Sequence, residues 1–553
     1  MIEKSWGSIV LCILSLGVVW AEGNVSPDRL VHSRSEPENW LTYSGTYDGW
    51  RYSTLTEIDV NNVHELVLQW AFQTGSTERF QATPLVADGI MYVALPNNGA
   101  VALDAQTGRS LWHYARTLPS DIPTCCGHVS RGVALSGNKV YMATLDGHLI
   151  ALDSKTGNLV FDREIDDYRK GYSFNLAPLV VKNNVLIGPS GAEFGIRGYV
   201  DAFDTETGRR NWRFYTIPAR GEPNHQTWEG DSWIHGGAAT WLTGSYDPEL
   251  NLVYWTTSNP GPANFGEHRE GDNLYSCSVV ALDADTGQLK WHFQFTPHDL
   301  HDWDANQIPV LVDLDIGGRR RKLLLDANRN GFFYVLDRTT GQFLFAKPYG
   351  HQTWAREIGA DGRPVELPGS RPTAEGVDVC PGLFGVTNWM SPSYSPQTEL
   401  FYVAAREECG RYFSSDQAFE NGHYWFGGHT TAREDAWGAL RALDPRTGQL
   451  RWEFRYASPP MAGVLSTAGA LVFSADMEGN FMAFDARSGQ NLWHVQTGAA
   501  IVASPMTYSV NGKQFVAIAS QSALFVFGLS GGPVRVVSGP EGTREKKTSG
   551  NRR

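Results

Sequence analysis

One short phrase recurs seven times along the chain and constrains its fold more than any other feature. Each copy has two apolar or small residues, an aspartate, two variable residues, Thr or Ser followed by Gly, and an aromatic residue four positions after the glycine. The aspartates of the seven copies are Asp104, Asp153, Asp204, Asp283, Asp337, Asp444 and Asp485. A self-similar phrase at a regular period is typical of repeat architectures, in which each copy belongs to one supersecondary unit.

The chemistry of the phrase predicts a β-hairpin. Apolar residues before the aspartate, as in Val101-Ala102-Leu103, suit a buried strand. An aspartate starts a tight turn by accepting backbone N–H groups, and glycine supplies the positive φ that the turn needs. Most intervals between the aspartates are roughly 40 to 55 residues, which fits a four-stranded unit. The two longer intervals predict insertions at about 215–275 and 346–436.

A four-stranded unit of this size cannot bury both of its faces alone, so radial stacking predicts an all-β fold, the β-propeller. The segment 63–72 looks like a strand that carries Trp70 without a preceding turn. The strands expected at 515–518 and 523–527 would pair with it and close the ring. This closure predicts eight antiparallel four-stranded blades, and seven blades is the alternative.

The composition and the two terminal segments indicate the class of protein and where it resides. The 553 residues are 42% hydrophobic and 19% charged, which argues against a disordered chain. A net charge of -13 argues against a general nucleic-acid-binding protein. Residues 1–21 read as a signal peptide with an apolar run too short to span a bilayer, although an uncleaved anchor is the alternative. We expect an exported protein without stable membrane insertion, a propeller over 38–530 and a disordered tail over 531–553.

Four segments between the repeats carry residues suited to chemistry. The first is Cys125-Cys126-Gly127-His128, followed by Arg131; a bond between adjacent cysteines closes a strained ring and rarely arises for stability. The others are 188–198, which contains Ser190-Gly191-Ala192-Glu193; 233–259, which contains Trp241 and Asn259; and 296–304, which contains Asp302 and Asp304. Carboxylate and amide oxygens are ligands for hard cations.

These four segments resemble the pyrroloquinoline quinone (PQQ) dependent alcohol dehydrogenases of the methanol and ethanol type, over essentially all of residues 38–530. The resemblance implies a Cys125–Cys126 disulfide against one face of the quinone and Trp241 against the other. It implies cofactor contacts from Gln81, Cys125, Cys126, Arg131, Asn175, Ser190, Gly191, Ala192, Trp241, Arg329, Asn388 and Trp389. It implies metal ligation by Glu193, Asn259, Asp302 and Asp304, with Asp302 also the catalytic base.

The identity of the metal depends on Asp304. This additional carboxylate resembles the lanthanide-using subset of the family, and three carboxylates suit a trivalent ion better than a divalent one. If Asp304 were only a capping or solvent-facing turn residue, Ca²⁺ would be the expected ion. The sequence therefore predicts PQQ together with one metal ion, a lanthanide(III) or Ca²⁺.

Two other cysteines extend the resemblance, and several residues depart from the family pattern. Cys380 and Cys409 match a second disulfide, which leaves Cys277 as a buried free thiol. Gln81 stands where many members of the family have Glu, and Asn175 and Ala239 stand where methanol enzymes have Thr. Met461 replaces a Trp near the edge of the quinone. These departures could weaken the affinity for the cofactor.

The resemblance implies a periplasmic enzyme that oxidises a small primary alcohol to an aldehyde by hydride transfer to metal-polarised PQQ. The chain has no CxxCH haem motif, so a separate soluble c-type cytochrome is the expected electron acceptor. The alternatives are a quinoprotein dehydrogenase that acts on sugars or polyols and a non-catalytic scaffold of the same repeat. The sequence leaves a homodimer open.

Overall fold

The computed structural model describes residues 24–530, and within them the fold is all-β, as predicted. Its one α-helix is α1 (Pro27–Val31). Short 3-10 turns lie at Ser33–Ser35, Val63–Glu65, Pro96–Asn98, Tyr168–Lys170, Ala192–Phe194, His225–Thr227 and Ser232–His235. The expected signal peptide (1–21) and tail (531–553) lie outside the described residues. In the described part, no helix is long and apolar enough to cross a bilayer.

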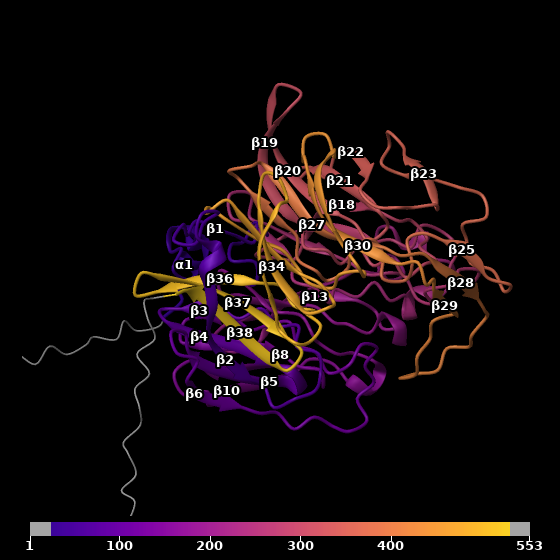
Figure 1. The fold of residues 1–553 in the computed structure, drawn as a ribbon. Helices are drawn as coiled ribbons and strands as arrows, with labels where there is room; N and C mark the ends of the chain where they lie inside the picture. The colour runs from indigo at the N-terminus through magenta and orange to yellow at the C-terminus, as the bar shows by residue number, and fades with distance from the viewer. Residues whose placement is uncertain (1–23, 531–553) are drawn as a thin grey trace, which may run out of the picture.

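Most strands form four-stranded antiparallel sheets whose members follow one another along the chain (Figure 1). Four such sheets are β3 (Leu85–Ala87), β4 (Ile90–Leu95), β5 (Gly99–Asp104), β6 (Ser110–Tyr114); β7 (Ala134–Ser136), β8 (Lys139–Ala143), β9 (His148–Asp153), β10 (Leu159–Glu164); β11 (Leu179–Val181), β12 (Asn184–Ile187), β13 (Tyr199–Asp204), β14 (Arg210–Tyr215); and β15 (Ser245–Asp247), β16 (Leu252–Thr256), β17 (Ser278–Asp283), β18 (Leu289–Gln294).

The second half of the chain continues this pattern. Its sheets are β19 (Val310–Ile316), β20 (Arg319–Ala327), β21 (Phe332–Asp337), β22 (Phe343–Pro348); β26 (Ser393–Ser395), β27 (Leu400–Glu407), β30 (Trp437–Leu443), β31 (Leu450–Tyr456); and β32 (Leu465–Thr467), β33 (Leu471–Ala475), β34 (Asn480–Asp485), β35 (Asn491–Gln496), to which β1 (Tyr52–Ser53) adds a parallel fifth strand.

The two ends of the described chain share one sheet. β2 (Leu66–Gln73) pairs antiparallel with β38 (Ala523–Leu529). In the same sheet β38 pairs with β37 (Lys513–Ser520), and β37 pairs with β36 (Met506–Val510). Figure 1 shows the yellow C-terminal strands beside the indigo strand β2. The expected pairing of segment 63–72 is confirmed for 523–527, whereas 515–518 pairs with 523–527 and not with 63–72.

The recurring phrase forms the predicted turns. In the first copy, Asp104 Oδ1 accepts the backbone N–H of Thr107 at 2.9 Å and its hydroxyl at 2.8 Å. Gly108 follows with φ +72°, a conformation that side chains with a Cβ rarely adopt. The side chain of the aspartate thus replaces backbone partners in the turn between β5 and β6.

In six cases the aromatic residue of one repeat, or the matching Trp70, packs directly against the glycine of the next turn; at Gly448 Lys347 is the nearest side chain instead. A Cβ added at Gly157 would lie 2.6 Å from the Trp112 ring, and the Trp112 indole N–H donates to the carbonyl of Ser154 at 2.9 Å. The same contact recurs between the rings and glycines Trp70–Gly108, Phe161–Gly208, Trp212–Gly287, Trp291–Gly341 and Trp452–Gly489. Neighbouring sheets are therefore packed face to face by a repeated aromatic contact.

The predicted insertions are too broad. Strands β15 and β16 lie inside 215–275 and strands β26 and β27 lie inside 346–436, yet all four belong to regular four-stranded sheets. These strands precede the turn phrase and carry no motif of their own, so counting between aspartates assigned them to the insertions. The added structure in 346–436 is two small sheets, β23 (Ala355–Ile358) with β24 (Pro364–Glu366), and β25 (Val377–Val379) with β28 (Gly410–Ser414) and β29 (Gly428–Ala432).

Candidate active site

Loops between the sheets enclose a cavity of about 480 Å³, which gathers nearly all of the residues singled out in the sequence. Its lining includes the expected residues Gln81, Cys125, Cys126, Arg131, Asn175, Ser190, Gly191, Glu193, Trp241, Asp302, Asp304, Arg329, Asn388 and Trp389. Two others do not line it directly. Ala192 lies between Gly191 and Glu193 with 3% of its surface exposed, and Asn259 is 1% exposed and bonded to Asp304.

One part of the cavity wall is formed by the disulfide and by aromatic rings. Cys125 and Cys126 are bonded to each other, as the resemblance implied. The Arg131 guanidinium lies 4.7 Å from the centre of the Trp241 ring and donates to Asn175 Oδ1 at 2.8 Å. Asn175, one of the departures from the family pattern, therefore holds Arg131 in place.

The segment that precedes Glu193 folds back on a neighbouring loop. Ser190 Oγ lies 2.8 Å from Ser173 Oγ, and the backbones of these residues form a short bridge. Gly191 has φ +120°, and a Cβ there would lie 2.0 Å from the carbonyl oxygen of Gly171. Only glycine fits this position, so the Ser-Gly-Ala-Glu motif has a steric reason as well as a chemical one.

Asp302 is held at the cavity by a strained turn. Its φ is +60°, which is uncommon for a residue other than glycine. The Asp299 carboxylate steadies the turn, because Asp299 Oδ2 accepts the backbone N–H of Trp303 at 3.1 Å and that of His301 at 3.3 Å. Strained backbone of this kind is often found at functional sites.

Asp304 is the most highly bonded carboxylate of the site. Its Oδ1 accepts the backbone N–H of Asn259 at 2.9 Å, and its Oδ2 accepts from Arg329 Nη1 at 2.7 Å and from the Trp241 indole at 3.3 Å. Asp304 is 6% exposed. The alternative of a solvent-facing turn residue is therefore wrong.

Arg329 joins the two aspartates to a loop. Besides its bond to Asp304, its Nη2 donates to Asp302 Oδ2 at 3.2 Å and to the carbonyl of Leu383 at 2.5 Å. Leu383 lies three residues after Cys380, which is bonded to Cys409 in the second expected disulfide. Cys277 is a buried free thiol, as expected.

Burial raises the proton affinity of the acidic groups. Burial, and secondarily the charge of Asp304, raises the pKa of Glu193 to about 7. Burial also raises the pKa of Asp302 well above its usual range, although the Arg329 charge opposes this shift. Two buried carboxylates, Asp302 and Asp304, and the half-buried Glu193 lie near one cationic side chain, and a bound cation would favour their ionised forms.

The donor set fits a hard metal ion. Within the described residues, Asn259 Oδ1 and Asp302 Oδ1 are buried and have no hydrogen-bond partner. Glu193, Asp302 and Asp304 line the same cavity, and Asn259 bonds Asp304, but the carboxylate oxygens of the three acids do not all lie within 4.8 Å of one another in the described chain. Their joint ligation of one metal ion therefore stays a prediction. Oxygen donors of this kind suit Ca²⁺ and other hard cations. Gln81 Oε1 and Arg131 Nε, also buried without a partner in the described chain, offer polar contacts to a cofactor.

The sequence reasoning missed part of the lining: Glu78, Arg79, Gly127, Leu383, Phe384, Tyr424 and Phe426. Gly127 and Leu383 are next to predicted features, so proximity in sequence could have pointed to them. Tyr424 and Phe426 belong to an irregular loop between β28 and β29. The only signal there is a local density of aromatic residues from Phe419 to Phe426.

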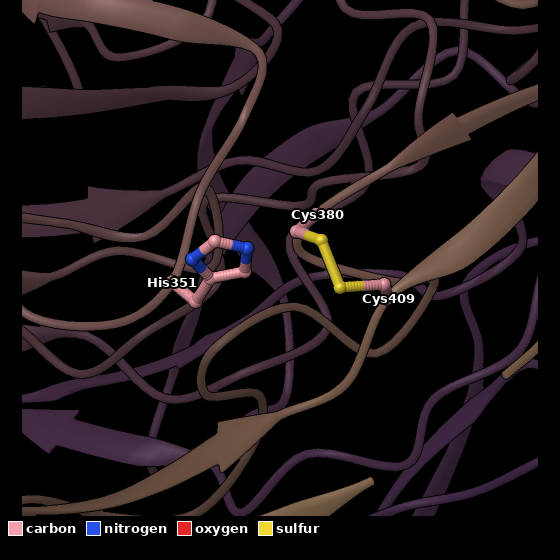
Figure 2. Close-up of side chains that lie close together, drawn as sticks. All are labelled: His351, Cys380 and Cys409. Carbon is pink, nitrogen blue, oxygen red and sulfur yellow. A yellow bond between two sulfur atoms is a disulfide. The ribbon is translucent and has the colours of Figure 1, made fainter. Parts of the chain in front are cut away.

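A second cluster of potential metal ligands lies apart from the predicted set. In residues 24–530, His351, Cys380 and Cys409 are the one group of His, Cys, Asp or Glu whose ligand atoms all lie within 4.8 Å of one another (Figure 2). Figure 2 shows both sulfurs joined in the disulfide. Metal ligation by cysteine requires thiolates, so the oxidised pair does not form a metal site.

Comparison with known proteins defines the class of this fold and cavity. The family model described as "PQQ: Glucose/ethanol/alcohol dehydrogenase, beta-propeller domain" matches residues 40–347 and 454–516. The chain therefore belongs to the family of PQQ-dependent quinoprotein alcohol dehydrogenases and has their β-propeller fold. It is an enzyme of this class, which contradicts the alternative of a non-catalytic scaffold.

Individual relatives have similar sequence identities to this chain. The quinoprotein alcohol dehydrogenase PedH of Pseudomonas putida is 39% identical over 93% of this chain and 91% of its own length. The lanthanide-dependent methanol dehydrogenase of Methylacidiphilum fumariolicum is 38% identical over 89% of this chain and 86% of its own. The solved structure of a europium-containing methanol dehydrogenase superposes with a TM-score of 0.87 at 34% identity, covering 91% of this chain and 100% of that one.

Proposed function

We propose that this enzyme oxidises a primary alcohol to an aldehyde, with Asp302 as the base that accepts the hydroxyl proton. The observation that carries this proposal is the meeting of Asp302, Asp304 and Arg329 in one cavity whose wall holds a disulfide of adjacent cysteines and Trp241. The names of the relatives, which are alcohol and methanol dehydrogenases, support the same substrate class.

Two sets of cavity residues would hold the cofactor and the metal ion. Arg131, Asn175, Ser190 and Gln81 would hold the polar groups of PQQ, and Glu193, Asn259, Asp302 and Asp304 would hold the metal ion. When bound, PQQ supplies a two-electron acceptor for the hydride and the metal supplies a Lewis acid that makes the acceptor more electrophilic.

The protein's own part is positioning and proton transfer. The strained turn presents Asp302 to the cavity, and Arg329 fixes its Oδ2 while Oδ1 has no partner in the described chain. Asp302 is thus placed to accept the alcohol proton as hydride leaves the carbinol carbon. The indole of Trp241 and the Cys125–Cys126 pair, both in the cavity wall, would hold the cofactor by contact with its apolar surface.

We further propose that the metal is a lanthanide. Asp304 adds a third carboxylate to Glu193 and Asp302, and a trivalent ion balances three negative charges better than Ca²⁺ does. The similarity to a lanthanide-dependent and a europium-containing methanol dehydrogenase supports this choice. Ca²⁺ is the competing ion, and the Asp304 variant discussed below distinguishes the two.

The number of blades, the cellular location and the electron acceptor are also proposals. Seven four-stranded antiparallel sheets and one sheet with the parallel strand β1 as its fifth would be eight blades over 38–530, with the β2–β38 pairing as the closure of the ring. The signal-like segment 1–21 supports export to the periplasm. An external soluble c-type cytochrome would accept the electrons, because the chain has no CxxCH motif.

The direct test is aldehyde formation from ethanol by metal-depleted protein given PQQ, La³⁺ and an electron-accepting dye. We expect turnover by the wild type and a loss of kcat of at least about a hundredfold in Asp302→Asn, the range of general-base catalysis. Binding of PQQ, followed by quenching of tryptophan fluorescence, should persist in the variant. Turnover that survives in Asp302→Asn would contradict the assigned base.

A further inference from the structure

A loop between β28 and β29 contributes two aromatic side chains to the cavity, and no sequence motif marks it. Tyr424 and Phe426 both line the cavity, with ring centres 5.5 Å apart and planes at 11°. Phe426 is 6% exposed, whereas Tyr424 is 49% exposed and lies toward solvent. The pair therefore forms an apolar wall that runs from the interior of the cavity to its mouth.

This wall is attached to the segments that carry the acidic residues. The backbone N–H of Trp425 donates to the carbonyl of Glu193 at 2.6 Å. The carbonyl of Phe426 accepts the N–H of Asn264 at 2.9 Å, and the Asn264 amide donates to the carbonyl of Leu300, two residues before Asp302. The two rings thus have a defined place relative to the proposed base.

One side chain fixes the loop. Gln417 Oε1 accepts the N–H groups of Phe426 at 3.0 Å and Gly427 at 3.1 Å, and its Nε2 donates to the carbonyl of Tyr424 at 2.8 Å. The Trp425 indole N–H donates back to the Gln417 carbonyl at 2.7 Å. A single exposed glutamine therefore bonds the backbone on both sides of the two rings.

We propose that Tyr424 and Phe426 are the wall that contacts the carbon chain of the alcohol, and that Gln417 is the positioning residue that holds this wall. The proposal rests on the proposed alcohol oxidation and narrows its substrates. Leu383 and Phe384 also line the cavity and add apolar surface. Each methylene buried against such surface contributes to binding, so the enzyme should prefer primary alcohols with an apolar chain of several carbons over methanol and ethanol.

The test is the ratio of kcat/KM for 1-hexanol to that for ethanol, measured in the enzyme loaded with PQQ and metal. Phe426→Ala should lower this ratio about tenfold, because the contact with the distal methylenes is lost. Gln417→Leu should lower it in the same direction through KM, and Gln417→Glu, which keeps the acceptor for two of the three bonds, should partly restore it. Tyr424→Phe keeps the ring and should keep the ratio.

Gln496 provides a matched control. It is exposed, accepts the N–H of Gly498 at 3.0 Å and donates to the carbonyl of Glu478 at 2.9 Å, but it does not line the cavity. Gln496→Leu should leave the chain-length ratio unchanged. An unchanged ratio in both Phe426→Ala and Gln417→Leu would overturn the proposal, as would an equal loss in Gln496→Leu.

A second measurement separates this proposal from the proposed function. Saturation-transfer NMR of 1-hexanol with the same protein should show the strongest transfer at the methyl end, reduced in Phe426→Ala. Saturation transfer to the carbon chain of hexanol without any alcohol oxidation would refute the proposed function and keep the proposed wall. Alcohol oxidation without preferential saturation transfer to the methyl end of hexanol would refute the wall and keep the proposed function.

Discussion

At the residue scale, the cavity is organised by a few side chains with several bonds each. Arg329 reaches both Asp302 and Asp304, and Asp304 in turn bonds the Asn259 backbone and the Trp241 indole. Because these groups share partners, their contributions should not be additive, and single variants at this cluster should have effects larger than one hydrogen bond would suggest.

The choice of metal is a prediction about Asp304. Asp304→Ser removes one negative charge but keeps a small polar side chain. We expect turnover with La³⁺ to fall at least tenfold relative to turnover with Ca²⁺, because charge balance favours the trivalent ion only with three carboxylates. Activity assays of metal-depleted protein with each ion test this. Equal losses with both ions would make Asp304 indifferent to the charge of the metal.

A buried acid outside the cavity predicts a pH dependence of stability. Burial raises the pKa of Asp326 to about 7, and only Asn328 bonds its carboxylate in the described chain. The folded state therefore holds this proton more tightly than the unfolded state, so its contribution to stability is present at low pH and falls as the pH rises from about 4 to about 7. Asp326→Asn cannot ionise and should remove this loss.

Thermal unfolding at pH 5 and pH 8 checks the sign. Relative to wild type, Asp326→Asn should gain stability on going from pH 5 to pH 8, by a few kcal/mol if the full shift applies. Comparing differences between the two proteins cancels the other titrating groups. A relative loss at pH 8 would show that the carboxylate is favourably ionised in the folded protein.

At the element scale, the sheets are joined by the contact between an aromatic ring and the glycine of the following turn. Trp112 is 8% exposed and lies against Gly157, whereas its neighbour Leu111 is 40% exposed. Because the contact recurs between successive sheets, it ties the hairpin turn to tertiary packing. The turn phrase is thus also a packing motif.

Removing one of these rings should cost far more than removing an exposed neighbour. Trp112→Ala should destabilise the protein by about 3–5 kcal/mol, since a buried ring and its bond to Ser154 are lost. Leu111→Ala should change stability by less than about 0.5 kcal/mol. Urea unfolding of both variants measures the difference, and similar values for the two would contradict the packing role.

The sequence predicted this level of structure well, for a physical reason. Aspartate and glycine at fixed offsets specify a turn almost independently of their surroundings, so the hairpins were predictable. The sheet shared by β2 and β38 was predictable because segment 63–72 carries the aromatic residue of a repeat but no turn before it. Strands such as β15 and β26 carry no turn phrase and were assigned to insertions. In the cavity, residues in compact motifs were predicted, but Tyr424 and Phe426 reach it through loop geometry that local sequence does not encode.

At the scale of the whole molecule, both ends of the described chain stabilise one sheet. β38 lies between β2 and β37, so removing it would leave two strands with unpaired edges. A chain ending at residue 521 should fail to give a soluble, cooperatively unfolding protein. A chain ending at 530 keeps β38 and should retain the melting temperature of the full chain. A soluble, cooperatively unfolding protein ending at 521 would contradict the role of the β2–β38 pairing.

The central claim is that alcohol oxidation takes place in this cavity, with PQQ as the acceptor and Asp302 as the base. The most direct measurement is a single turnover without dye: protein loaded with one equivalent each of PQQ and La³⁺ is mixed with excess ethanol, and aldehyde and reduced quinone are quantified together. We predict one aldehyde per quinone reduced in the wild type and neither product on that timescale in Asp302→Asn. Reduced quinone without aldehyde, or equal yields from the variant, would contradict the account.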